Sequence, residues 1–84
     1  MNELFVMNTF LEQRGYNAYL KSSDKLKVEG NTLYSNGLQL AQIREETLYV
    51  DLSTQDDESF NEHRDILLRL VRTFPYEVKY LAKL

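Results

Sequence analysis

The stretch KLKVEGNTLYSNGLQLAQIREETLYVDL, residues 25–52, decides the fold. Apolar and polar side chains alternate along it, which is typical of strands that bury one face, and short turns interrupt the alternation. Residues that tolerate positive φ stand at Gly30-Asn31 and Asn36-Gly37, and Asn-Gly between alternating segments is a strong hairpin signal. The stretch therefore predicts an antiparallel meander of about four strands.

The alternation also predicts which side chains of the meander point inward. Residues 16–21, just before this stretch, also alternate, with Ala18 and Leu20 on one face and Tyr19 and Lys21 on the other. The alternating segments within the stretch are 25–29, 32–35, 38–44 and 47–52, with inward residues Leu26, Val28, Leu33, Leu48, Val50 and Leu52. The phase changes after Leu40, because Ala41 and Ile43 take the other parity. An extra residue in one strand has this effect, so we expect a β-bulge near Leu40.

Helices are predicted on both sides of the meander. Residues 2–14 carry apolar side chains at helical spacing, and a glycine follows them. A second helix is expected to start with Ser53 or Thr54 as N-cap and to run to about Thr73, ahead of Pro75. Its inward line is predicted to be Phe60, His63, Leu67, Leu70, Val71 and Phe74.

The C-terminal tail fits two interpretations. Residues 76–84 alternate like a strand, yet they also fit a short helix with Pro75 at its first position. We favour the helix because Glu77, Lys79 and Leu81 are good helix formers. The element order predicts an α+β fold in a single domain, residues 1–84, with both helices on one sheet face and the other face open.

The composition excludes several classes of function. The 84 residues include no cysteine and one histidine, which removes disulfides, thiolate zinc sites and cysteine nucleophiles. No Walker A, GxGxxG or nucleophile-elbow motif occurs, and the spacing supplies His63 with no partner for base catalysis. We expect a non-enzymatic protein without cofactor or metal. Neither a secretory leader nor a membrane-spanning run is evident, so we expect a cytoplasmic protein without membrane contact.

Charge is distributed unevenly, although the net charge is only −3. Acidic side chains dominate residues 45–65, and the candidates for an acidic binding face are Glu45, Glu46, Asp56, Asp57 and Glu58. Acidic residues also collect where helices begin, because the helix dipole favours negative charge there. The run Asp56-Asp57-Glu58 fits this second explanation as well.

The outward sheet face is a second candidate surface. Tyr19, Tyr34 and Tyr49 all take the outward phase, and Lys25 and Lys27 share it. Tyrosine is enriched in protein interfaces, so we expect this face or the acidic one to bind a protein or a second copy of the chain, as a homodimer. The alternative is a single-stranded nucleic acid stacked on the tyrosines, which a pI near 5.0 disfavours.

The segment GNTLYSNGLQLA, residues 30–41, followed by TLYVD at 47–51, resembles a pattern in small uncharacterised phage and prophage proteins of low-GC Gram-positive bacteria. Those proteins have a similar hairpin, a second strand and a polar segment that leads into a histidine-containing helix. The similarity covers about residues 31–63. Those proteins often have tyrosine at the position of Asn36, and a Ser/Thr-rich stretch where this chain has Asp56 to Glu58. The resemblance implies a phage-type origin, and it implies no catalytic residue. We expect a phage-encoded protein that binds a host protein and inhibits or redirects it.

Overall fold

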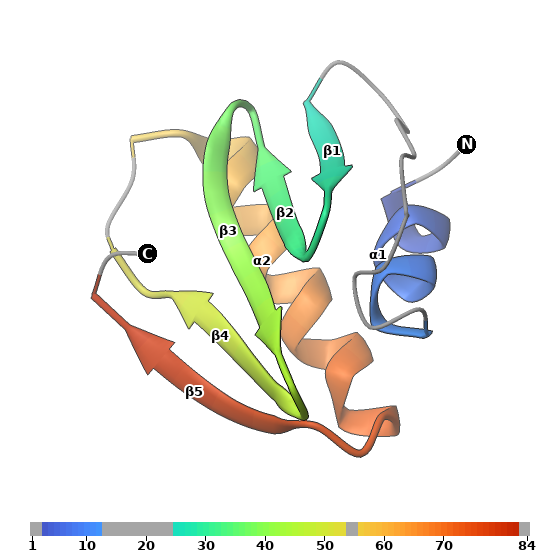
Figure 1. Ribbon diagram of the computed structural model, residues 1–84. Helices are drawn as coiled ribbons and strands as arrows, with labels where there is room; N and C mark the ends of the chain where they lie inside the picture. Colours follow the sequence, from blue (N-terminus) through green and yellow to red (C-terminus); the bar gives the residue numbers. More distant parts are fainter. Residues whose placement is uncertain (1–2, 13–24, 54–55, 83–84) are drawn as a thin grey trace.

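The computed structural model of the protein describes residues 3–12, 25–53 and 56–82 (Figure 1). An N-terminal helix precedes four strands, a second helix with a short 3-10 turn, and a fifth strand. The helical elements are α1 (Glu3–Glu12), α2 (Glu58–Leu70) and η1 (Val71–Thr73), and the strands are β1 (Leu26–Glu29), β2 (Thr32–Ser35), β3 (Leu38–Arg44), β4 (Thr47–Asp51) and β5 (Glu77–Leu81). The expected α+β fold is confirmed, with five strands rather than four.

The strands form one sheet in the order β1-β2-β3-β4-β5. The first four strands pair antiparallel, as the meander predicts. In contrast, β5 pairs parallel to β4, because α2 carries the chain back across the sheet before β5 begins. Figure 1 shows β5 at the edge of the sheet, beside β4.

The turns and the bulge of the meander agree with the sequence. Asn36 and Gly37 have φ of 52° and 82°, so the β2–β3 hairpin has the positive φ values expected of it. Leu33 pairs with Ala41 while Tyr34 pairs with Gln39, which leaves one extra residue in β3. That residue is Leu40, where the bulge was predicted.

Both helices pack on the same side of the sheet. In Figure 1 α2 lies behind the sheet, where it contacts β2 and β3, and α1 lies beside β1 and also contacts α2. The fully buried side chains form one core cluster, which includes Phe10, Leu33, Leu48, Phe60 and Leu67. The inward positions predicted for Leu33, Leu48, Phe60 and Leu67 are therefore confirmed.

Leu52 was predicted to be core, and this is wrong. The residue is 49% exposed, because β4 ends at Asp51 and the chain leaves the sheet there. Its backbone N–H still donates to the carbonyl of Leu81, at 2.8 Å.

The favoured interpretation of the tail was also wrong. Glu77–Leu81 is a strand, although its residues favour a helix, because the edge of β4 offers unpaired backbone groups. Val78 lies opposite Leu48 and packs against the core. Hydrogen bonding and apolar packing thus override the local helix propensity.

The second helix starts later than expected. Its N-cap is Asp57, whose carboxylate accepts a hydrogen bond from the backbone N–H of Phe60 at 3.2 Å. Ser53 is not the cap, and its own N–H donates to the Asp51 carboxylate at 2.6 Å. Thr54 lies outside the described residues. In the acidic run, Asp56 therefore precedes the helix, Asp57 is its N-cap, and Glu58 lies in its first turn.

Candidate functional site

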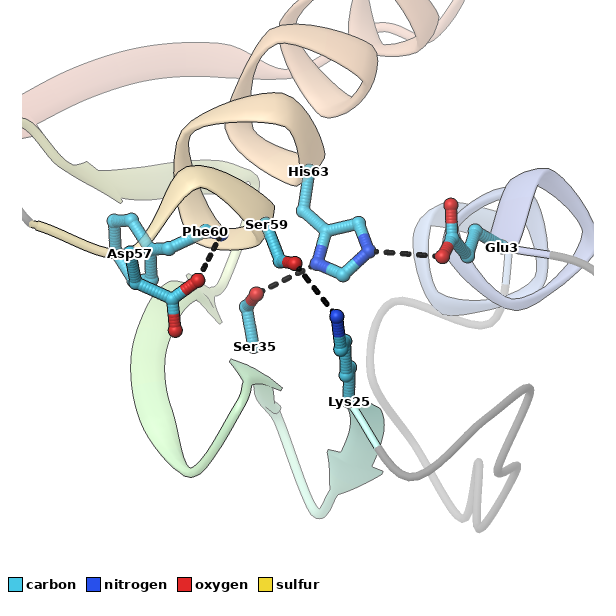
Figure 2. A network of polar contacts seen from close by, with 7 residues as sticks. All are labelled: Glu3, Lys25, Ser35, Asp57, Ser59, Phe60 and His63. Atoms are coloured by element: carbon cyan, nitrogen blue, oxygen red, sulfur yellow. Dashed lines mark hydrogen bonds and ion pairs between the residues drawn. The ribbon is translucent and has the colours of Figure 1, made fainter.

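A buried histidine joins three elements of the fold (Figure 2). His63 of α2 is 3% exposed, and its Nδ1 lies 2.6 Å from the hydroxyl of Ser35 in β2. Its Nε2 lies 3.1 Å from a carboxylate oxygen of Glu3, in the first turn of α1. Both ring nitrogens therefore have partners, as a buried imidazole requires.

The order of side chains in this group is serine, histidine, carboxylate, the same order as in a hydrolase triad. The exposure of the group is the reverse of what a triad needs, however, because the serine is enclosed and the carboxylate is exposed. Ser35 is 0% exposed, whereas the side chain of Glu3 is 42% exposed. A nucleophile must meet its substrate, and this hydroxyl is enclosed by the core. What the arrangement provides is a polar tie between α1, β2 and α2.

A second polar group surrounds the start of α2. The side-chain amide of Asn36 and the N–H of Phe60 both donate to Asp57, which lowers the pKa of that carboxyl below its ordinary value. Lys25 lies nearby, and its Nζ donates to the hydroxyl of Ser59 at 3.1 Å (Figure 2). Lys25 was predicted to lie beside the tyrosines. The structure instead directs it to the helix side, where it bonds to Ser59 and its charge is attracted by the Asp57 carboxylate.

We call the other side of the sheet the helix-free face, since no helix among the described residues covers it. The strand register places on it Lys27, Glu29, Thr32, Tyr34, Gln39, Gln42, Arg44, Thr47, Tyr49, Asp51, Glu77, Lys79 and Leu81. Tyr34 and Tyr49 are both half-buried, and β3 runs between their strands. The two tyrosines thus share one face, together with Lys27, while Tyr19 lies outside the described residues.

Several charges of the helix-free face already have partners within it. Lys27 pairs with Glu29 at 3.2 Å. The guanidinium of Arg44 lies over the ring of Tyr49, 5.1 Å from the ring centre, and its Nε donates to Gln42 at 2.6 Å. Lys79 lies opposite Tyr49 on the neighbouring strand. The face is therefore a mixed surface of tyrosine, amide and charge rather than a purely basic one.

The acidic residues do not form one surface. Glu45 and Glu46 make the exposed turn after β3, and Glu45 has a φ of 56°. Asp57 lies at the other end of β3, where Asn36 binds it just before that strand begins, and Asp56 and Glu58 flank Asp57 in the chain. At about 3.3 Å per residue, seven residues of β3 separate the two groups by roughly 20 Å. The single acidic face predicted from the sequence is divided by the fold.

The pattern of the sequence indicates the inward position of His63 but not its two partners. Ser35 shares the inward parity of Leu33, and His63 lies on the inward line of its helix. Two polar residues at inward positions are a signal for a buried polar pair. The contact with Glu3 had no such signal, because it depends on how α1 packs against α2.

Comparisons with known protein families, with curated proteins and with solved structures found no match to this chain. Among the described residues, no three histidine or acidic side chains are grouped so that they could hold a metal ion. Over the same part of the chain, no helix is both long and apolar enough to cross a membrane.

Proposed function

We propose that this protein is a non-enzymatic interaction module that binds another protein through its helix-free face. The observation that carries the proposal is the placement of Tyr34 and Tyr49 on a sheet face that neither α1 nor α2 covers. Tyrosine contributes large, rigid contact area and a hydrogen-bonding hydroxyl, and it is enriched in protein interfaces. Half-buried rings flanked by Gln39 and Gln42 suit such a contact.

The polar group around His63 supports a non-enzymatic role. Its serine hydroxyl is enclosed, so the histidine has no accessible nucleophile to activate. Each member instead satisfies another buried polar atom. The chemistry of this group is therefore that of a structural tie.

The charge of the helix-free face favours a protein over a nucleic acid. Lys27 is neutralised by Glu29, and Arg44 is held against Tyr49. Glu77 adds a further carboxylate to the same face and offsets the charge of Lys79. Phosphate contacts dominate the affinity of nucleic-acid binding, and carboxylates within the surface oppose them.

The kind of partner that we propose rests on the phage-type origin that the resemblance to phage and prophage proteins implies. On that basis the partner is a host protein of the bacterial cytoplasm, which the bound chain inhibits or redirects. A partner surface with complementary lysine, arginine or amide groups would suit the two tyrosine hydroxyls.

Matched variants test the proposal. Gln39→Arg adds a bulky charged side chain at an exposed position of the helix-free face, and Glu62→Arg does the same on the exposed side of α2. Proteins retained from a bacterial lysate by the wild type and by Glu62→Arg, but lost with Gln39→Arg, are the expected partners. Binding is then measured with the purified partner. The double substitution Tyr34→Ser/Tyr49→Ser is expected to abolish the same binding.

The salt dependence of binding separates the two classes of ligand. A protein contact centred on tyrosine is expected to change little with salt, whereas binding of a labelled oligonucleotide would weaken steeply. Oligonucleotide binding that is steep in salt and lost with Tyr34→Ser/Tyr49→Ser would overturn the proposal. So would a partner whose affinity is the same for all variants that remain folded by circular dichroism.

A further inference from the structure

The two edges of the sheet differ in what lies beside them. At one edge β1 is flanked by α1, which contacts it. At the other edge β5 has β4 on one side, and on its other side no strand of the described chain pairs with it. An uncovered edge strand presents backbone N–H and C=O groups that can pair with another strand.

The ladder with β4 shows which backbone groups of β5 point outward. Glu77 donates its N–H to the carbonyl of Glu46 at 3.1 Å, and the carbonyl of Leu81 accepts from Leu52 at 2.8 Å. The N–H and C=O of one strand residue point to the same side, and neighbouring residues alternate. Glu77, Lys79 and Leu81 therefore point toward β4, while Val78 and Tyr80 direct their backbone groups outward.

One way to pair this edge with itself matches the two charges of β5. In an antiparallel pair centred on Val78, that residue exchanges two hydrogen bonds with Val78 of a second copy. The same register sets Glu77 opposite Lys79 of the second copy, and the two-fold symmetry repeats the contact. Centring the pair on Lys79 would instead set two lysines against each other.

Other features of the edge fit the same register. Within the described part of the chain, the side chains of Glu77 and Lys79 have no ion-pair partner. Tyr80 is 51% exposed, and the register brings it opposite Tyr76 of the second copy. Pro75, which has no N–H, falls at a position where none is needed.

We propose that the protein forms a two-fold symmetric homodimer through antiparallel pairing of β5 with β5 of a second copy, centred on Val78. The sheets of both copies then join into one continuous sheet. Because the two-fold axis stands perpendicular to the sheet, both helix-free faces lie on the same side, and the dimer presents two copies of the tyrosine surface. A five-residue strand buries little area, so the dimer is weak and concentration-dependent.

Charge reversal tests this pairing through its symmetry. Sedimentation velocity of the full chain across the micromolar range is expected to show a reversible dimer. Glu77→Lys and Lys79→Glu each set like charges opposite each other twice, and each is expected to raise the dissociation constant about tenfold or more. The double variant Glu77→Lys/Lys79→Glu restores opposite charges and is expected to dimerise again. An equimolar mixture of the two single variants, one fluorescently labelled, is expected to form the mixed dimer.

Two controls separate pairing from folding and from net charge. Glu62→Lys changes the charge equally at an exposed position of α2 and is expected to leave the dimer intact. Val78→Pro removes an outward N–H and is expected to abolish the dimer, whereas Val78→Ala keeps that N–H and is expected to dimerise. Circular dichroism checks that each variant is folded.

Three outcomes would overturn the proposal. The first is a wild-type chain that stays monomeric at every concentration. The second is a dimer that the single charge reversals do not weaken, or that the double variant does not restore. The third is a dimer that is lost with Gln39→Arg yet retained with Val78→Pro, which would place the contact on the helix-free face. None of these measurements needs the partner protein, so this proposal and the proposed function fail separately.

Discussion

The two faces of the sheet come from the same strands but have opposite characters. Leu48 and Val50 of β4 are fully buried on the helix side, while Tyr49 between them is half-buried on the helix-free face. The strand geometry alone makes this division, because neighbouring side chains point to opposite faces. The helix side holds the core, and no helix of the described residues covers the other face.

Polar side chains on the two faces differ in how far they are buried and in what they bond to. Ser35 on the helix side is enclosed, and it is satisfied by His63. On the helix-free face Lys27 and Glu29 pair at about half exposure and remain hydrated. An enclosed polar side chain such as Ser35 therefore needs a fixed partner, whereas an exposed pair such as Lys27 and Glu29 needs only water, and substitutions of the two kinds should differ accordingly.

The largest expected contrast is between Leu48→Ala and Gln39→Ala. Leu48 is fully buried, and its truncation is expected to cost about 2–5 kcal/mol of unfolding free energy. Gln39 is exposed on the helix-free face, and its truncation is expected to change stability by less than about 0.5 kcal/mol. Chemical denaturation followed by circular dichroism measures both. Equal unfolding free energies for the two variants would show that Leu48 and Gln39 have been assigned to the wrong faces of the sheet.

The polar tie on the helix side is tested by His63→Leu. This substitution leaves the hydroxyl of Ser35 enclosed without its partner, and we expect a loss of about 1–3 kcal/mol. Removing both groups in Ser35→Ala/His63→Leu should cost less than the sum of the single changes, because neither polar atom is then left unsatisfied. Additive losses in a double-mutant cycle would mean that the two side chains are not coupled.

The turn that joins β2 to β3 is tested by Gly37→Val. Gly37 has a φ of 82°, and a Cβ added there would meet no atom within 4 Å apart from its chain neighbours, so the main cost is backbone strain. We expect a loss of about 1–2 kcal/mol for valine. Gly37→Asn should lose much less, because asparagine tolerates positive φ. Thermal melts of the two variants compare them, and equal losses would contradict a strain of this kind.

The smallest expected effect concerns the cap of α2 and depends on pH. Folding lowers the pKa of Asp57, so its stabilising contribution is present above its ordinary value of 3.8 and is lost as the pH falls below that value through the lowered one. Asp57→Asn should therefore lower the melting temperature at neutral pH and approach the wild type in strong acid. A difference that stays constant with pH would exclude the carboxylate as its source.

The sequence predicted the parts of this fold that depend on local geometry. The inward phase of β1, β2 and β4 follows from the two-residue period of a strand. The hairpin at Asn36-Gly37 follows from the backbone freedom of those residues, and the bulge at Leu40 follows from a change of parity. Each of these features can be recognised within a few residues of the chain.

The features that the sequence missed depend on partners far along the chain. Residues 77–81 became a strand because α2 brought them beside β4, and Leu52 became exposed because the chain left the sheet before it. His63 gained Ser35 and Glu3, and the acidic residues separated to opposite ends of β3.

By itself, the sequence thus determined which side chains share a face, because that depends only on neighbouring dihedral angles. Only the tertiary structure decided which edges pair, which polar groups meet and which charges gather. Those outcomes depend on satisfying backbone and side-chain groups across the whole molecule, and no local pattern contains that information.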